Sequence, residues 1–260
     1  MKDRILKTIV FGLFLLLASS VYAKTEDVSF HAILAVDIFA EDIQWSTIQD
    51  LAHVKKSVYS IAHQLGLKPD IQVIKAADCS VHNIKKALRS VVGYKDDIIM
   101  FYYSGHGNKD PQNHPWPVMY PSQSVYGRGL LGASVVKYFK HHPHRLALVW
   151  MDCCNKHISP GPYASITKEP LVIGQNEHLP GLRHLFLESR GLVVGSGANH
   201  GEASIGLTDG GVFTNALLSG LKIKCNNESV TWGDIFSYVS SYCPEHAQPD
   251  PQHPIMQYFP

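Results

Sequence analysis

The chain lacks a strong charge of either sign. Its 260 residues include 23 lysines and arginines and 22 aspartates and glutamates. Lys2, Asp3, Arg4 and Lys7 lie at the amino terminus, and the rest of the chain holds 20 basic and 21 acidic residues. A nucleic-acid-binding domain usually carries a clear basic excess. The net charge therefore argues against nucleic acid as a partner.

Cysteine is scarce, and no cysteine–histidine spacing of the zinc-finger kind is present. The five cysteines leave at least one thiol unpaired in an exported protein. Cys225 and Cys243 could form a disulfide, whereas a bridge between the adjacent Cys153 and Cys154 would be strained. The histidine cluster at 141–144 is more typical of a solvated helix end than of a metal site. We therefore expect neither a metal ion nor a cofactor.

A long apolar run occurs only at the amino terminus. A basic start, an apolar run over 9–18 and small residues up to Ala23 are the three parts of a secretory signal peptide. About ten apolar residues are too few to span a bilayer comfortably, and an uncleaved anchor is the alternative. We predict a signal peptide over 1–23 and a single domain over 24–260. The protein is then exported, periplasmic or secreted, without stable membrane association after cleavage.

Strand-like and helix-like segments alternate along the remaining chain. Strands are predicted over 30–38, 70–76, 97–103, 145–151 and 191–196. Helices are predicted over 47–65, 80–92, 133–141, 182–188, 212–221 and 231–242. Alternation of this kind predicts an α/β fold whose mostly parallel central sheet has helices on both faces. In such sheets ligands bind beyond the carboxyl ends of the strands.

Two short motifs about fifty residues apart each follow a predicted strand. Residues 104–107 read SGHG and residues 152–155 read DCCN. A histidine and a cysteine at the carboxyl ends of two strands are what a Cys–His catalytic dyad needs, because an imidazole can deprotonate a neighbouring thiol. The alternative is a strand-exit turn with an incidental histidine. The pairing of the two motifs favours a cysteine peptidase with His106 as general base.

The nucleophile could be Cys153 or Cys154. Side chains alternate in an extended segment, so Asp152 and Cys154 share one face and Cys153 points to the other. Cys154 is therefore the predicted nucleophile, and Cys153 is the predicted core thiol. The backbone amides of Gly107 and Cys154 are candidates for the oxyanion hole. Asp152 could bind a cationic substrate side chain or cap the amides of its own loop.

Four segments of the chain resemble one known family. Residues 97–107 (DIIMFYYSGHG) and 145–154 (RLALVWMDCC) are similar to the two catalytic segments of the caspase/metacaspase superfamily of cysteine peptidases. Residues 191–221 resemble the strand and helix that complete that fold, and residues 252–254 (QHP) resemble its closing Gln-x-Pro element. The histidine also lies roughly 50 residues before the cysteine, as it does in caspases.

This resemblance runs from about residue 30 to the carboxyl terminus and implies the caspase-haemoglobinase fold. It also implies that His106 is the base, that Cys154 is the nucleophile and that no cofactor is used. The Asp-x-Cys pattern at 152–154 is closer to metacaspases, which cleave after arginine or lysine, than to caspases, which cleave after aspartate. By that similarity Asp152 would line a specificity pocket for basic side chains.

The chain also departs from metacaspases. Their early helix usually supplies a second acidic residue to the pocket, whereas residues 51–55 (LAHVK) contain no carboxylate. Cys154 is followed by Asn-Lys-His in place of the typical His-Ser-Gly. The acidic calcium-binding insert is also missing, because the stretch after His106 has only Asp110 and a Ca²⁺ site needs several carboxylate oxygens. Calcium activation is therefore not expected.

We therefore expect an exported cysteine endopeptidase that favours arginine or lysine at P1, the residue on the amino side of the cleaved bond. Its expected partners are peptide or protein substrates. The departures at 51–55 and after Cys154 leave a catalytically inactive module that binds peptides or proteins as the alternative. A metal-dependent hydrolase that uses the histidines is a third possibility.

Overall fold

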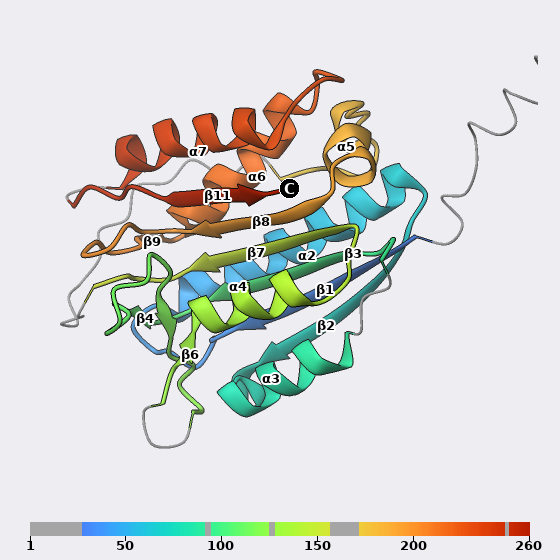
Figure 1. Ribbon diagram of the computed structural model, residues 1–260. Coiled ribbons are helices and arrows are strands. Elements are labelled where there is room, and N and C mark those ends of the chain that lie inside the picture. The colour runs from blue at the N-terminus through green and yellow to red at the C-terminus, as the bar shows by residue number, and fades with distance from the viewer. Residues whose placement is uncertain (1–27, 92–94, 125–127, 157–171, 248–249) are drawn as a thin grey trace, which may run out of the picture.

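The apolar stretches of the chain form a six-stranded sheet at the centre of the protein, seen here in a computed structural model (Figure 1). The structure describes residues 28–91, 95–124, 128–156, 172–247 and 250–260. In spatial order the strands are β11 (Ile255–Phe259), β8 (Gly191–Ser196), β7 (Leu146–Asp152), β3 (Ile98–Ser104), β1 (Ser29–Val36) and β2 (Lys68–Lys75). Neighbouring strands are parallel, except that β11 runs antiparallel to β8. The predicted α/β fold with a mostly parallel sheet is confirmed.

The two strands at the centre of the sheet are buried along their whole length. Every residue of β3 and of β7 is buried. Both strands are almost continuously apolar, which is the pattern of parallel strands covered on both faces and the reason they occupy the middle of the sheet. Strands further out carry more polar side chains, and β2 at one edge has a single buried residue, Ile74.

Helices cover both faces of this sheet (Figure 1). One face carries α2 (Gln44–Leu65), α5 (Gly181–Arg183), α6 (Val212–Lys224) and α7 (Trp232–His246), whose apolar side chains share one core. The other face carries α3 (Val81–Ser90) and α4 (Gly132–His141), which pack over a second core. The sheet therefore separates two hydrophobic cores, and each has its own set of helices.

Two small sheets lie at the carboxyl ends of the parallel strands, on the left in Figure 1. One consists of β4 (Gly107–Asn108), β5 (Val118–Met119) and β6 (Leu130–Leu131), and the other of β9 (Gly206–Leu207) and β10 (Gly210–Gly211). Both are built from the loops that follow central strands. They give the loops at this edge a defined shape.

The predicted N-cap of α3 is confirmed, and the structure differs from the predicted elements at one helix and one strand. Ser80 is the N-cap of α3, and its side chain accepts a hydrogen bond from the Asn83 amide at 3.3 Å. The helix predicted over 182–188 is α5 followed by a π-helical turn, His184–Glu188. Strand β11 was not predicted, because its five residues form no alternating pattern and it pairs with β8 alone.

The possible disulfide between Cys225 and Cys243 is not present. All five cysteines are free and buried. Cys225 directly follows α6 and precedes α7, whereas Cys243 lies near the far end of α7. At 1.5 Å per residue the helix separates the two positions by roughly 15 Å, far beyond the reach of a disulfide.

The predicted signal peptide over 1–23 lies outside the described residues. Within the part of the chain that the structure describes, no helix is both long enough and apolar enough to cross a membrane.

The free cysteines give a first testable prediction. We expect all five thiols to react with an aromatic disulfide reagent in denaturant without prior reduction. In the native protein Cys154 should react first, because it is 7% exposed while the other four are at most 1% exposed. A titration that finds three thiols would contradict this structure, and loss of the first native phase in Cys154→Ala is the control.

Candidate active site

The ends of β3 and β7 lie level with each other. Ser104 at the end of β3 is paired with Asp152 at the end of β7. The Gly105 amide donates a hydrogen bond to the Asp152 carbonyl at 3.3 Å. His106 and Cys154 each lie two residues beyond this pair, and both line one pocket. The structure therefore brings the two predicted dyad residues to the same site.

Gly107 allows the two strand-exit loops to approach each other. A Cβ atom at this position would lie 2.7 Å from the Cys153 sulfur and still closer to the Cys154 carbonyl oxygen. A side chain there would push the loops apart, so the close approach requires glycine. The predicted oxyanion residues Gly107 and Cys154 are thus in contact through their backbones.

Cys153 and Cys154 belong to opposite cores. Cys153 packs in the core beneath α3 and α4, whereas Cys154 borders the core on the other face. The Cys154 thiol donates a long hydrogen bond to the Ser204 carbonyl, with 3.6 Å between sulfur and oxygen. The two cysteines point to opposite sides, and Cys154 is the more exposed of the two.

The environment of Cys154 holds it in the thiol form. Burial raises the pKa of this thiol, and the Asp152 and Asp42 carboxylates act in the same direction. The hydrogen bond with Ser204 and the Lys156 ammonium oppose them. A thiol with a raised pKa is a weak nucleophile at neutral pH. Attack by Cys154 therefore needs a base beside it.

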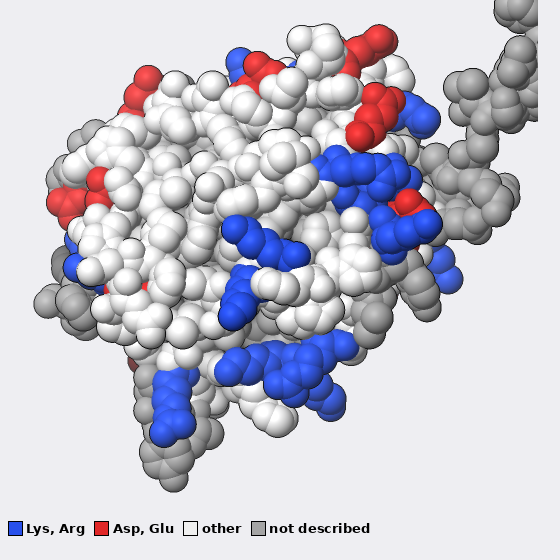
Figure 2. Space-filling model, viewed as in Figure 1, with Lys and Arg blue, Asp and Glu red and all other residues white. Residues whose placement is uncertain are grey.

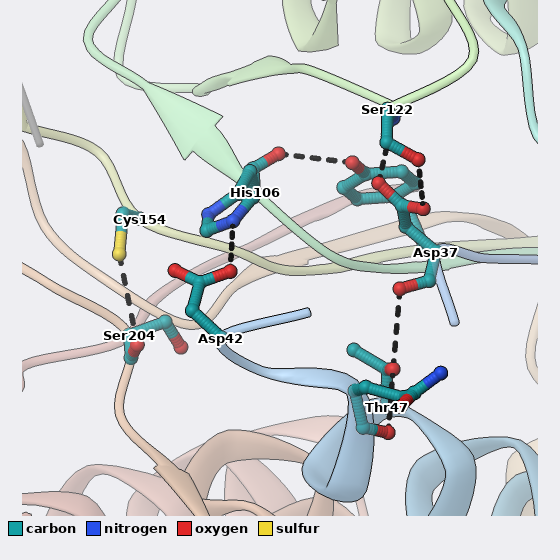
Figure 3. A network of polar contacts seen from close by, with 9 residues as sticks. Asp37, Asp42, Thr47, His106, Ser122, Cys154 and Ser204 are labelled. Carbon is teal, nitrogen blue, oxygen red and sulfur yellow. Dashed lines mark hydrogen bonds and ion pairs between the residues drawn. The ribbon is translucent and has the colours of Figure 1, made fainter. Parts of the chain in front are cut away.

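His106 is held from two directions (Figure 3). Its ring Nε2 lies 2.8 Å from Oδ1 of Asp42. Its backbone carbonyl accepts hydrogen bonds from the Tyr103 hydroxyl and the Tyr120 amide, both at 2.9 Å. The ring edge turned away from Asp42 faces Cys154 (Figure 3). A neutral imidazole that donates from Nε2 to Asp42 presents Nδ1 as an acceptor on the Cys154 side.

Asp42 was missed in the sequence because no pattern marks it. It follows β1 in an irregular segment, and its carboxylate is 42% exposed. Nothing about an exposed acid in a loop distinguishes it from other surface charges. Only the folded loop shows that it reaches His106.

The same network fixes the end of β1 (Figure 3). The buried Asp37 carboxylate accepts hydrogen bonds from the amide and the hydroxyl of Ser122, both at 2.7 Å. The Thr47 hydroxyl donates to the Asp37 carbonyl at 3.2 Å. These bonds tie the segment that carries Asp42 to α2 on one side and to the segment after β5 on the other.

Asp152 lies at the inner end of the pocket and is 6% exposed. Its carboxylate accepts hydrogen bonds from the Ser204 hydroxyl and the Thr214 hydroxyl, each at 2.6 Å, and from the Thr214 amide at 3.1 Å. Burial raises the pKa of this carboxyl, while these three donors favour the charged form. The pocket thus ends in a buried, hydrogen-bonded carboxylate.

The expectation that the pocket has no second acid is wrong, because Asp50 supplies one. Asp50 is 1% exposed and accepts hydrogen bonds from the Ser104 hydroxyl at 2.6 Å and the Gly211 amide at 2.7 Å. It lies one residue before the 51–55 stretch, on the same inward face of α2 as Thr47 and Val54. An aspartate in phase with the buried side chains was the signal that could have identified it.

The two carboxylates form a coupled pair around Gly211. Burial is the main cause of the raised pKa of Asp50, and the charge of Asp152 raises it further. A Cβ atom on Gly211 would collide with Asp152, while the Gly211 amide binds Asp50. No lysine, arginine or histidine among the described residues forms an ion pair with Asp50 or Asp152.

A third acceptor lies close to Asp50. Gly210 has φ +122, and a Cβ atom there would lie 2.6 Å from Asp50 Oδ1 and 3.1 Å from Asn215 Oδ1. Asn215 is 1% exposed, and this oxygen has no hydrogen-bond partner in the described structure. The surroundings of Gly210 are therefore rich in acceptors, and its backbone conformation and lack of space both require glycine.

Gln252 holds the loop that forms the far wall of the pocket. Its side chain donates to the Gly197 carbonyl at 2.8 Å and accepts from the Ile205 amide at 2.8 Å. It also donates to the Ser204 hydroxyl at 3.2 Å, and this hydroxyl binds Asp152. The closing element at 252–254 thus supports the pocket as well as leading into β11.

The described residues contain no group of three or more histidine, cysteine, aspartate or glutamate side chains placed to hold a metal ion. The chemistry available at the site is that of a thiol, an imidazole and carboxylates.

Comparison with solved structures shows the fold. The crystal structure of caspase-1 from Spodoptera frugiperda matches with a TM-score of 0.59 and 13% sequence identity, covering 91% of this chain and 90% of that one. Protein GSU0716 from Geobacter sulfurreducens matches with a TM-score of 0.53 and 15% identity, covering 89% of this chain and 92% of that one. No curated protein matches the chain in sequence.

The family comparison agrees with the fold and with the two strand-exit motifs. The family model described as the caspase domain matches residues 38–257, which is most of the chain. This range contains both strand-exit motifs and the two buried carboxylates of Asp50 and Asp152. The chain therefore belongs to the caspase domain family.

Proposed function

We propose that the protein is a cysteine endopeptidase that cleaves peptide bonds after arginine or lysine. The observation that carries the proposal is one pocket that brings together Cys154, His106 and the two buried carboxylates of Asp50 and Asp152. The first pair supplies the chemistry of peptide hydrolysis, and the second pair supplies the binding site for a basic side chain.

The catalytic cycle follows from the positions of these groups. His106 takes the proton of Cys154, and the thiolate attacks the carbonyl carbon of the peptide bond. The backbone amides of Gly107 and Cys154 stabilise the oxyanion that forms. His106 then protonates the leaving amine, and water hydrolyses the acyl-enzyme. Apart from the peptide substrate and water, the protein's own residues supply every group in these steps.

The preference for a basic P1 side chain follows from the cost of two neighbouring buried carboxylates. Burial raises the pKa values of both Asp50 and Asp152, and the charge of Asp152 raises the pKa of Asp50 further. An incoming guanidinium or ammonium carries one positive charge, which would offset one of the two negative charges, and it would supply hydrogen-bond donors to both carboxylates. An aspartate at P1 would add a third negative charge at the same place.

We further propose that the protein is exported. The basic start, the apolar run over 9–18 and the small residues before Lys24 support a cleaved secretory signal. The catalytic domain would then act outside the cytoplasm.

The low exposure of the nucleophile favours a second candidate function. Cys154 is 7% exposed and its pKa is raised, and Asp152 is already satisfied by three donors of its own chain. A poorly exposed thiol and a carboxylate already satisfied by its own chain are the features expected of a module that binds peptides without cleaving them. An active-site thiol probe distinguishes the two, since it labels only a reactive Cys154.

Of the predictions about function, the first concerns cleavage itself. With fluorogenic peptides that differ only at P1 (Arg, Lys, Asp or Asn), we expect hydrolysis after Arg and Lys that disappears in Cys154→Ala. Cys153→Ala is the matched control, because that thiol packs in the opposite core and should be dispensable for turnover. Cleavage after Asp or Asn would overturn the specificity, and no cleavage or labelling would support the binding module.

The second prediction concerns the carboxylate pair. Because burial raises the pKa of Asp50, the folded state binds its proton more tightly than the unfolded chain does, so the free energy of unfolding falls as pH rises above about 3.8. Asp50→Asn removes this pH-dependent loss of unfolding free energy, because asparagine has nearly the same shape as aspartate and carries no charge. We expect its Tm to rise at pH 7 by roughly 2–4 °C, which corresponds to about 1 kcal/mol, and the gain to vanish near pH 4.

The same variant should lose activity, with kcat/KM for Arg substrates reduced roughly tenfold or more, as for a lost charge-assisted interaction. Asp234→Asn is the stability control of opposite sign, because hydrogen bonds from Thr231 lower the pKa of Asp234 and its loss should reduce Tm. A lower Tm together with unchanged Arg cleavage in Asp50→Asn would refute the role of the pair.

The third prediction concerns Asp42 as a positioning residue for His106. The contact between His106 and Asp42 is partly exposed, so its contribution is about 1 kcal/mol or less. We expect Asp42→Asn to lower kcat by roughly two- to fivefold with KM and Tm unchanged, and Asp42→Glu to restore part of the loss. A parallel fall in Tm, or a change confined to KM, would show that the carboxylate acts in another way.

A further inference from the structure

Positive charge is concentrated on helices α3 and α4. The exposed basic residues are Lys85, Lys86 and Arg89 on α3 and Lys137 and Lys140 on α4. Neither helix contains an aspartate or glutamate, and the longer segments 79–95 and 111–151 contain none either. We call the surface formed by these five side chains the basic face.

The basic face is continuous. The Tyr138 hydroxyl of α4 donates a hydrogen bond to the Leu88 carbonyl of α3 at 2.7 Å, so the two helices lie side by side. Both rest on the same core. Figure 2 shows lysine and arginine side chains over both helices, whereas acidic side chains lie toward the edges of this view.

The five cations have no acidic partner within the described structure. Ion pairs on this side of the molecule involve Arg145 and Arg190, which share Asp96 at its edge. Of the five, Lys140 has an aromatic neighbour, with its ammonium 3.6 Å from the centre of the Phe259 ring. Unpaired charges of one sign repel each other, and an anionic partner would remove that cost.

Although the net charge of the chain is close to zero, its positive and negative charges lie on different parts of the molecule. Five basic residues without acidic partners gather on the α3–α4 side, while Asp42, Asp50 and Asp152 lie at the carboxyl ends of the strands. The net charge excluded a uniformly basic surface and gave no information about this distribution.

We propose that the basic face binds an anionic lipid bilayer, reversibly and without insertion. The exposed large apolar side chains are Phe39, Ile48, Tyr59, Ile223 and Tyr258, and none of them lies on α3 or α4. A surface without exposed phenylalanine, tyrosine or tryptophan side chains lacks the usual stacking platform for unpaired bases. It also offers nothing that could enter the acyl region of a membrane. Two adjacent helices with outward-pointing cations fit a plane of anionic headgroups.

The expected binding is weak and sensitive to salt. Each lysine or arginine near an anionic membrane surface increases the affinity roughly fivefold. Five such residues amount to an increase on the order of 10³-fold, and physiological salt screens the attraction over about 8 Å. Binding of this strength is reversible and leaves the domain otherwise unchanged.

Binding through the basic face would leave the active site open. The pocket lies at the carboxyl ends of the strands, on the left in Figure 1, while α3 and α4 cover a face of the sheet. A domain that rests on α3 and α4 would present the pocket sideways, along the membrane surface. This proposal does not depend on the peptidase activity.

The test compares two matched pairs of charge reversals in the whole protein. Lys85→Glu/Lys86→Glu changes the basic face, and Lys55→Glu/Lys56→Glu changes an adjacent exposed pair on α2, on the opposite side of the sheet. Co-sedimentation uses vesicles of phosphatidylcholine alone or with about one-third phosphatidylglycerol. The apolar run over 9–18 is present in every sample, so its contribution cancels.

We expect binding to anionic vesicles that exceeds binding to neutral ones and falls with added salt. The α3 pair should weaken it at least 25-fold, the α2 pair should change it less than threefold, and neither should alter peptide hydrolysis. Equal losses from both pairs would show an effect of net charge and overturn the proposal. A short DNA duplex that binds more tightly than the vesicles and depends on Lys85 and Lys86 would assign the face to nucleic acid.

Discussion

The level ends of β3 and β7 are the constraint on which the rest of the site depends. The parallel register pairs Ser104 with Asp152, so each motif begins at the same height in the sheet. Shifting this pairing by one residue would move the imidazole away from the thiol and turn alternate side chains to the wrong face. The register is held by two strands that are buried throughout, and the close contact at Gly107 joins the loops beyond them. The most apolar part of the protein thus determines the positions of its most polar groups.

The buried carboxylates show that this site is not arranged for stability. Asp50 and Asp152 are held beside each other by hydroxyl and amide donors, without a cation among the described residues. Such a pair costs folding free energy that a basic ligand can recover. Three donors already satisfy Asp152, so a substrate cation must compete with Ser204 and Thr214. Under the proposed specificity a guanidinium is favoured over weaker donors, because it offers several planar N–H groups and carries its charge at every physiological pH.

The sequence alone predicts the strands, which are apolar runs, and the motifs that directly follow strands. It does not predict residues whose role depends on how distant segments of the chain fold together. The apolar runs identify the central strands, and the two motifs identify His106 and Cys154. Asp50 lies one residue before the 51–55 stretch that was compared with metacaspases. Apolar residues do not mark the inward face of α2 reliably, because Ile48 is 44% exposed in the structure. The inward face instead carries Thr47, Asp50 and Val54. Asp42 has no sequence signal, since its contact with His106 depends on how an irregular segment folds between α2 and the loop after β5.

The distribution of charge also depends on the fold and cannot be read from the composition. Acidic groups in the pocket come from α2 and β7, and the basic face comes from α3 and α4, which lie across the sheet from α2. A parallel sheet makes this separation possible, because successive crossovers place helices on either face while the strand ends remain at one edge. Helices on one face are therefore free to vary in charge without entering the site. Under the two proposals, a change on α3 or α4 would alter the surface that the domain binds, whereas a change at Asp50 on α2 would alter what the pocket binds. The two surfaces of this chain are physically independent, although a single sheet positions both.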